Sequence, residues 1–452
     1  MFVGGPRNYI EFWFTGARVR WCEELAVNVV LRRSSAAAAC AARKMLAATL
    51  LSAVSFAAPT TKPLRLTVNG SSLLDPSGAK IRLTGFNWQS GRTGPDPGGL
   101  MKQLAPGATV ARLVGVLWGN TDPLQSHPNK ECMTTEPPHY FNDKCFDDLD
   151  PWVKSATDAG LWVILAVRGE YVAGQNFDTD PGSSIFRNAT LANMSFAMWR
   201  HVAAHYASWD RIAAYEILSE PRDKTVAASA VREYYEGGCA AAQSVDPATP
   251  CLVGNAPYYK LWDFGEATLL RTTTNAIYTF DYFNPDAFVF GNGGDTTGAL
   301  GAAYPAIPSY GDGASYPCET LYDGWVEQVC PSWNVSRASD PVRFDRAWHE
   351  HNLRTFALPL RAAHNVPLFM NQFEVVHGVT NASGRYAYIA DLLGLAKELD
   401  IGWAWWTWAG GNDGGWSHGS SEVVFRWPNG TIMVDEAVLD TMEPFWRRRL
   451  AG

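Results

Sequence analysis

Short apolar runs recur along most of the chain, and polar or helically patterned stretches separate them. The runs are rich in Val, Ile, Leu and aromatic residues, which is typical of buried strands. They fall at about 81–86, 109–117, 161–167, 212–218, 250–254, 276–280, 366–370 and 401–406. A helical spacing of apolar residues predicts helices in most of the intervals, at 149–159, 191–206, 226–245, 344–363 and 386–399.

Strands that alternate with helices in this way predict an α/β fold, and eight of them predict a (β/α)8 TIM barrel. We expect this barrel to form one domain over residues 58–452. The alternative is a doubly wound open sheet, but no G-x-G-x-x-G turn opens a helix after the first strand. Residues 64–81 precede the first barrel strand, and their alternating pattern and Asn69-Gly70 turn predict an N-terminal β-hairpin.

The first 57 residues have a different character from the rest. Arg43-Lys44 precede an apolar run from Met45 to Phe56, and small residues follow at the positions that a signal peptidase reads. The run is too short to span a bilayer as a helix. We therefore expect a secretory signal peptide cleaved near Ala57, with an upstream extension before Met45; a longer targeting presequence is the alternative.

Cysteines and glycosylation motifs agree with export. Six cysteines beyond the signal fall into three pairs, each about a dozen positions apart. Although six cysteines allow fifteen pairings, this clustering favours short disulfide-closed loops. The predicted bridges are Cys132–Cys145, Cys239–Cys251 and Cys318–Cys330. Asn-x-Ser/Thr sequons occur at Asn69, Asn188, Asn193, Asn334, Asn381 and Asn429.

Composition narrows the partners. The chain has 452 residues and a formal net charge of -8, without a basic run in its body, which argues against a nucleic-acid partner. Its 19 tryptophans can fill a core or stack on sugar rings. We expect no membrane span in the mature chain, no cofactor, and a monomer. His349-Glu350-His351 is a weak metal motif, because residues two apart on a helix face different ways.

The ends of the predicted strands carry the candidate chemistry. Glu220 ends the fourth strand at a Glu-Pro step, and the C-terminal ends of barrel strands are where catalytic groups collect. Other ends carry Trp88, Arg168, Asp281 with Tyr282, Gln372 with Glu374, and Trp406, while Arg112 lies in the second strand. Glu216 lies mid-strand, where we expect it to pair with Arg112 or Arg211. Carboxyl groups, an arginine and tryptophans on one face suit glycoside hydrolysis, which uses two carboxyl groups.

From about Leu64 to the C-terminus the chain resembles glycoside hydrolase family 5, the cellulase-type clan of retaining (β/α)8 enzymes. The resemblance is carried by Leu83-Thr84-Gly85-Phe86-Asn87-Trp88, Arg112, Ile217-Leu218-Ser219-Glu220-Pro221, Ile277-Tyr278-Thr279-Phe280 and Gly402-Trp403-x-x-Trp406. It implies that Glu220 is the acid/base, that Arg112 orients the nucleophile and that Trp406 is a sugar platform. Secretion and a polysaccharide or oligosaccharide substrate, such as a β-glucan or mannan, follow as expectations.

The chain departs from that family at four of its strand ends. Ser219 replaces an asparagine before the acid/base, Asp281-Tyr282-Phe283 replaces a His-x-Tyr, and Arg168 replaces a histidine. In ungapped register, Gln372 occupies the position of the nucleophilic glutamate. A neutral amide is a poor nucleophile and cannot offset an oxocarbenium charge.

We hypothesise that Glu374 serves as the second carboxylate, because residues two apart in a strand point the same way. Asp281 is the reserve candidate for this duty, and the competing interpretation is that Glu374 is solvated in the loop after the strand. The step from 372 to 374 covers about 6 to 7 Å, which leaves both retaining and inverting outcomes open. Two functions follow: a secreted β-glycosidase or transglycosidase, or a glycan-binding protein that has lost turnover through Gln372.

Overall fold

The chain forms two compact units, residues 1–61 and 62–452. In the first unit, β1 (Glu11–Phe14) pairs with β2 (Ala17–Arg20) as an antiparallel hairpin. The predicted apolar segment of the signal peptide lies outside the described residues. The computed structural model describes residues 11–14, 17–20, 62–89, 96–116, 132, 142–168, 184–291, 308–322, 326–409, 421–426 and 431–446.

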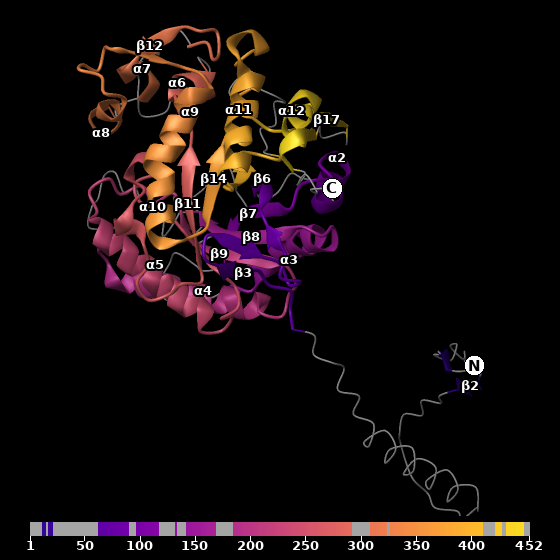
Figure 1. Cartoon of the computed structure of the whole chain (residues 1–452). Coiled ribbons are helices and arrows are strands. Elements are labelled where there is room, and N and C mark those ends of the chain that lie inside the picture. The colour runs from indigo at the N-terminus through magenta and orange to yellow at the C-terminus, as the bar shows by residue number, and fades with distance from the viewer. Residues whose placement is uncertain are drawn as a thin grey trace, which may run out of the picture. The chain divides into compact units, whose positions relative to one another are not determined.

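Eight parallel strands of the second unit close into a barrel in the order β10-β11-β14-β15-β6-β7-β8-β9 (Figure 1). Each strand overlaps one predicted apolar run, so the (β/α)8 prediction is confirmed. Every residue of β7 and β9 is buried, which explains why these runs are continuously apolar rather than alternating. The strands are β6 (Thr84–Gln89), β7 (Val110–Val116), β8 (Trp162–Arg168), β9 (Ile212–Ser219), β10 (Cys251–Val253), β11 (Ala276–Tyr282), β14 (Leu368–Phe373) and β15 (Gly402–Trp405).

Helices surround these strands, and the longer ones match the predictions. The predicted helix at 344–363 is divided into α9, a π-helical turn (Leu353–Ala357) and α10. Pro359 lies in the first turn of α10, where its missing N–H is tolerated. The helices are α2 (Pro97–Leu104), α3 (Lys144–Asp158), α4 (Ala189–Tyr206), α5 (Ala228–Gln243), α6 (Asp286–Val289), α7 (Cys318–Tyr322), α8 (Val326–Val329), α9 (Arg346–Asn352), α10 (Leu358–His364), α11 (Arg385–Glu398) and α12 (Glu436–Trp446).

The predicted N-terminal hairpin is present and gains a third strand. It comprises β3 (Thr67–Asn69), β4 (Ser72–Leu74) and β5 (Lys80–Ile81), which pair antiparallel. Leu66 and Leu73 pack in one apolar cluster with residues that begin the barrel strands, such as Val110. The hairpin therefore closes the barrel at the end where its strands start, opposite the strand ends that carry the candidate chemistry.

The three predicted disulfides are confirmed. Their Cα atoms lie 5.0 Å apart for Cys132–Cys145, 5.8 Å for Cys239–Cys251 and 5.9 Å for Cys318–Cys330, within the ordinary range for a bridge. The second bridge ties α5 to β10, so it braces a helix against the barrel. The third lies in the long β11–β14 connection, which also holds the short ribbon of β12 (Ser315–Pro317) and β13 (Pro341–Arg343). Two further short strands, β16 (Val424–Arg426) and β17 (Ile432–Val434), follow β15.

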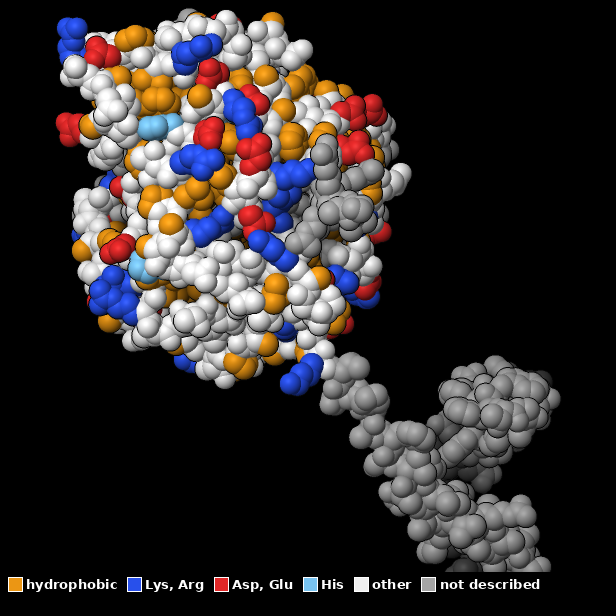
Figure 2. All heavy atoms as spheres, in the orientation of Figure 1, with side chains coloured by type: hydrophobic (Ala, Val, Ile, Leu, Met, Phe, Trp, Pro, Cys, Tyr) orange, Lys and Arg blue, Asp and Glu red, His pale blue; other side chains and the backbone are white. Residues whose placement is uncertain are grey.

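The surface in Figure 2 carries basic, acidic and apolar side chains side by side, and the two signs of charge are interspersed over this face. None of the helices in the described part of the chain is both long enough and apolar enough to cross a lipid bilayer.

Candidate active site

Glu220 immediately follows the last residue of β9 and is half-buried. Its backbone has φ +45°, in the left-handed region that residues other than glycine rarely adopt. Pro221 disfavours the right-handed helical conformation at the residue before it. Strained backbone of this kind clusters at functional sites, where surrounding structure holds it in place. The sequence prediction of a carboxyl group at the C-terminal end of this strand agrees with this placement.

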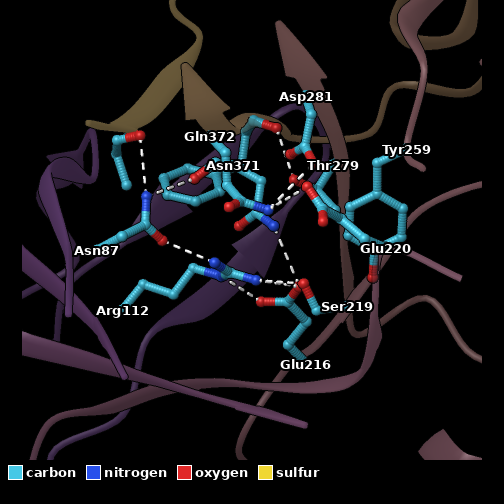
Figure 3. Close-up of polar contacts among 12 residues, drawn as sticks. Asn87, Arg112, Glu216, Ser219, Glu220, Tyr259, Thr279, Asp281, Asn371 and Gln372 are labelled. Atoms are coloured by element: carbon cyan, nitrogen blue, oxygen red, sulfur yellow. Dashed lines mark hydrogen bonds and ion pairs between the residues drawn. The ribbon is translucent and has the colours of Figure 1, made fainter. Parts of the chain in front are cut away.

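A single amide joins Glu220 to a second carboxyl group (Figure 3). Gln372 Nε2 donates to Glu220 Oε1 at 2.7 Å and to Asp281 Oδ2 at 3.1 Å. An amide nitrogen carries two hydrogens, so it has one for each carboxyl group. The ends of β9, β11 and β14 thus converge on one polar cluster, which we call the Glu220–Asp281–Gln372 cluster.

A β-bulge brings Gln372 into this cluster. Along β11 and β14, Phe280 pairs with Met370 but Asp281 pairs with Gln372, so Asn371 is the extra residue. Asn371 also faces the site, since its Nδ2 donates to Glu216 Oε1 at 3.1 Å. Strict alternation, on which the prediction for residues 372 and 374 rests, is therefore interrupted at this strand end.

Beneath the cluster lies a fully buried ion pair. Arg112 donates through Nε to Glu216 Oε2 at 2.5 Å and through Nη2 to Oε1 at 2.7 Å, which confirms the predicted pairing of Glu216 with Arg112. Arg112 also donates to Asn87 Oδ1 at 2.7 Å and to Ser219 Oγ at 2.6 Å. Both side chains of the pair are 0% exposed. Arg112 and Ser219, 0% and 4% exposed, therefore support the polar cluster from the barrel interior, and their predicted part in substrate binding stays a prediction.

Asp281 is almost completely buried, at 2% exposure. Burial raises the pKa of its carboxyl group well above the ordinary value, and the charge of Glu220 and a hydrogen bond with it raise the pKa further. Arg112 opposes this shift. A carboxyl group in such surroundings favours its protonated form, or shares a proton with its neighbour.

Glu374 follows β14 directly and is 8% exposed, so the interpretation as a solvated loop residue is wrong. Ser421 Oγ donates a short hydrogen bond to Glu374 Oε2. Burial raises the pKa of Glu374 to about 8; the Ser421 hydrogen bond opposes the shift, while the charges of Glu422 and Glu220 add to it. Glu374 is therefore mostly neutral at pH 7 and ionises near pH 8.

The three aromatic residues named at the predicted strand ends differ in exposure. Trp406 is half-buried and keeps an accessible part. Trp88 and Tyr282 are each 0% exposed, and the Tyr282 hydroxyl hydrogen-bonds His349 Nδ1 at 2.9 Å. Trp88 and Tyr282 are therefore packed in the core, where a ring offers no accessible face to a sugar. The side chain of Arg168, at the end of β8, lies outside what the structure describes.

The His349-Glu350-His351 motif does not converge on a common point. His349 contacts Tyr282, Glu350 accepts from Arg354 Nε at 2.7 Å, and the His351 ring lies 2.8 Å from Ser332 Oγ. Within the described ranges, no three His, Cys, Asp or Glu side chains are grouped so that they could hold a metal ion.

Sequence reasoning missed Asn87, Asn371 and Ser421 as parts of the site. Asn87 and Asn371 stand at strand ends beside residues that were selected, and their position was the only signal. Asn87 Nδ2 donates to the backbone oxygens of Asn371 at 3.0 Å and Ala404 at 3.1 Å, so it ties three strands together. Ser421 follows β15 in a loop, and nothing in its local pattern marks it.

Comparisons with known proteins agree with the barrel fold. The sequence model "Cellulase (glycosyl hydrolase family 5)" matches residues 75–412. Endoglucanase 3 of Fibrobacter succinogenes (strain ATCC 19169 / S85) is 23% identical over 273 residues, which cover 56% of this chain and 40% of that protein. This chain therefore spans less than half the length of that relative.

Solved structures with the same fold include a broad-specificity endoglucanase from Bacteroides salanitronis, with a TM-score of 0.56 and 14% identity over 80% of this chain and 92% of that one. Thermotoga maritima Cel5A in complex with cellobiose matches with a TM-score of 0.55 and 15% identity, covering 80% of this chain and 97% of that one. At these identities the likeness concerns the fold.

Proposed function

Because the chain belongs to glycosyl hydrolase family 5, we propose that it cleaves O-glycosidic bonds of a β-linked polysaccharide such as a β-glucan or mannan, with Glu220 as the acid/base. The observation that carries this proposal is the position of Glu220 at the C-terminal end of β9, half-buried and hydrogen-bonded to Gln372 within a cluster of carboxyl groups. Half-exposure lets the carboxyl group reach a glycosidic oxygen in the cleft, and acidic neighbours favour retention of its proton.

In the proposed reaction Glu220 protonates the leaving oxygen while the bond from that oxygen to the anomeric carbon breaks. Glu374 is the second carboxylate, which offsets the positive charge that develops on the sugar. The charge of Glu220 is one cause of the raised pKa of Glu374, which supports an electrostatic link between the two carboxyl groups. Since that pKa is about 8, Glu374 becomes an effective anion only in mildly alkaline solution, and we expect activity to rise toward pH 8.

The substrate half of the proposal is tested by incubating the mature protein with β-glucans and mannans at pH 6 to 9 and measuring reducing ends. We expect release from at least one polymer, with Glu220→Gln as the matched blank. Trp406, half-buried at the end of β15, is the proposed sugar platform. Absence of release from every polymer, by a protein that is folded, would contradict hydrolysis.

A second candidate function, glycan binding without turnover, is favoured by Gln372, a neutral side chain in contact with Glu220. Retention on insoluble polymers without release of sugar would support it. Glu374→Ala, Asp281→Ala and Gln372→Glu, compared on one substrate with the product anomer followed by NMR, separate the two functions. If Glu374→Ala keeps full activity, its assignment falls; if only Gln372→Glu turns over, the natural protein is a binder.

Export is the remaining part of the proposal, with cleavage of a signal peptide near Ala57. Three disulfides support an oxidising compartment. Among the sequons in the described ranges, Asn69, Asn193, Asn334 and Asn381 are exposed, whereas Asn188 caps α4 through its side-chain oxygen. Mass spectrometry of the protein from a eukaryotic host should find the new N-terminus and glycans at the exposed sites.

A further inference from the structure

Asp281 is an acid whose surroundings offer little positive charge. Its Oδ2 accepts from Gln372, whereas its buried Oδ1 accepts no hydrogen bond from an N–H or hydroxyl group in the described part of the chain. The nearby cation, Arg112, donates hydrogen bonds through Nε and Nη2 to Glu216. The carboxyl group of Glu220 is the neighbour with which Asp281 makes its remaining side-chain hydrogen bond.

Two carboxyl groups at this spacing cannot both be ionised without a large cost. Glu220 and Asp281 hydrogen-bond the same amide nitrogen, at 2.7 and 3.1 Å, so the two bonded oxygens are close neighbours. Like charges so near one another in a buried site raise the pKa of the pair, as in other carboxyl dyads. The charge of Glu216 on β9 also raises the pKa of Asp281.

We propose that Asp281 is a positioning residue that helps Glu220, the acid of the reaction, to stay protonated. Glu220 and Asp281 hold one proton between them, and the Gln372 amide donates a hydrogen bond to each carboxyl group. This inference rests on the proposed function, in which Glu220 is the proton donor. In the resting site the two carboxyl groups share one proton, which can move to Glu220. When Glu220 gives the proton to the leaving oxygen, both carboxyl groups are ionised, and their repulsion makes Glu220 a stronger base for removing a proton from water.

This arrangement explains why a glutamine suits position 372. Its nitrogen supplies two N–H donors, one to each carboxyl group, and its neutral side chain adds no charge. A glutamate at that position would place a third acid against the pair and remove both donors. Gln372 therefore holds the carboxyl groups of Glu220 and Asp281 next to each other.

The shared proton also explains how Glu220 can be protonated at a pH at which Glu374 is ionised. Glu374 ionises only near pH 8, where an ordinary glutamic acid has lost its proton. Glu220 must stay protonated at that same pH to act as the acid. Sharing its proton with Asp281 supplies this property, since the charge on one carboxyl group stabilises the proton on the other.

The test is a titration of Glu220 itself, by carboxyl 13C NMR of the full chain labelled in its glutamates, with the signal assigned through Glu220→Gln. We expect Glu220 to titrate well above the ordinary value of a glutamate, and Asp281→Asn to lower that pKa by about one unit or more because a like charge is removed. Gln372→Met should change it in the opposite direction, since lost N–H donors disfavour the ionised forms. Asp263→Asn, at an exposed aspartate outside the cluster, is the control and should leave it unchanged.

The pH profile of kcat/KM gives the second readout, because a merely structural role would lower activity at all pH values without moving the profile. We expect its alkaline limb to move to lower pH in Asp281→Asn by the same amount as the NMR titration. An unchanged Glu220 titration in Asp281→Asn would overturn the proposal even if the enzyme is active. A shifted titration without turnover on any polymer would uphold the shared proton and refute the proposed function instead. Should Asp281→Asn fail to fold, the direction of the Gln372→Met shift decides.

Discussion

Where the strands of the barrel begin, buried charge is paired, and where they end, buried acids lie against one another. At the first end, Arg65 forms a 3.0 Å ion pair with Asp246, and its Nη2 also donates to the backbone oxygens of Tyr206 and Ala207. At the other end, Asp281 and Glu374 have raised pKa values caused first by burial. One end therefore stabilises the fold, while the other stores unfavourable electrostatic energy that catalysis can use.

The largest loss of stability is expected from removal of the buried ion pair between Arg65 and Asp246. Arg65→Met leaves the carboxylate of Asp246 buried without its cation, which costs about 3 to 5 kcal/mol of the free energy of unfolding. Urea denaturation at pH 7 measures this loss. Lys80→Met, which removes an exposed pair with Asp400, is the control and should change stability by less than about 1 kcal/mol. Equal losses in the two variants would remove the distinction between paired buried charge and surface charge.

At the end of the barrel where the strands stop, removal of a buried acid is expected to stabilise the protein at high pH. The pKa of Glu374 in the folded protein is about 8, above its ordinary value of 4.5, so the folded state holds the proton more tightly than the unfolded state. Stability is therefore lost as the pH rises from 4.5 through 8. Glu374→Gln should remove this loss and stabilise the protein at pH 9 by about 4 to 5 kcal/mol, with little change at pH 4. Thermal unfolding at both pH values checks the prediction, and a destabilised variant at pH 9 would contradict it.

A smaller effect, on binding rather than on folding, is expected at Trp406. Trp406→Ala should weaken binding of a soluble oligosaccharide by roughly tenfold, as expected for one lost aromatic contact, and leave the pH profile unchanged. Trp333→Ala is a useful control, because Trp333 stacks on His351 at 3.8 Å, away from the strand ends. Isothermal titration calorimetry measures both affinities. A similar loss in both variants would mean that Trp406 has no special place in the cleft.

The same comparison explains what could be predicted from sequence. All eight barrel strands and the Arg112–Glu216 pair were predictable, because long apolar runs and a mid-strand carboxylate carry local signals. The bulge at Asn371 was not, since its cause is the register between β11 and β14 rather than a pattern within either strand. The burial of Trp88 was missed for a related reason: strands covered on both faces show no alternation to separate core from cleft.

Contacts between a strand end and a distant loop also could not be predicted from the sequence. Ser421 fixes the carboxyl group of Glu374 from 47 positions away, and only the folded chain brings them together. Asp281 illustrates the intermediate case. Its position at a strand end was predictable, whereas its hydrogen bonds with Gln372 and Glu220 depend on three strands meeting at one height.

The central claim, that Glu220 is the proton donor, is tested most directly by the leaving-group dependence of Glu220→Gln. This variant keeps the size of the side chain and removes proton transfer. We expect kcat/KM to fall by about a hundredfold or more on substrates with poor leaving groups, and by much less on activated aryl glycosides, whose leaving groups need no proton. An equal loss on both kinds of substrate would contradict the account, because it would mean that Glu220 does not deliver the proton.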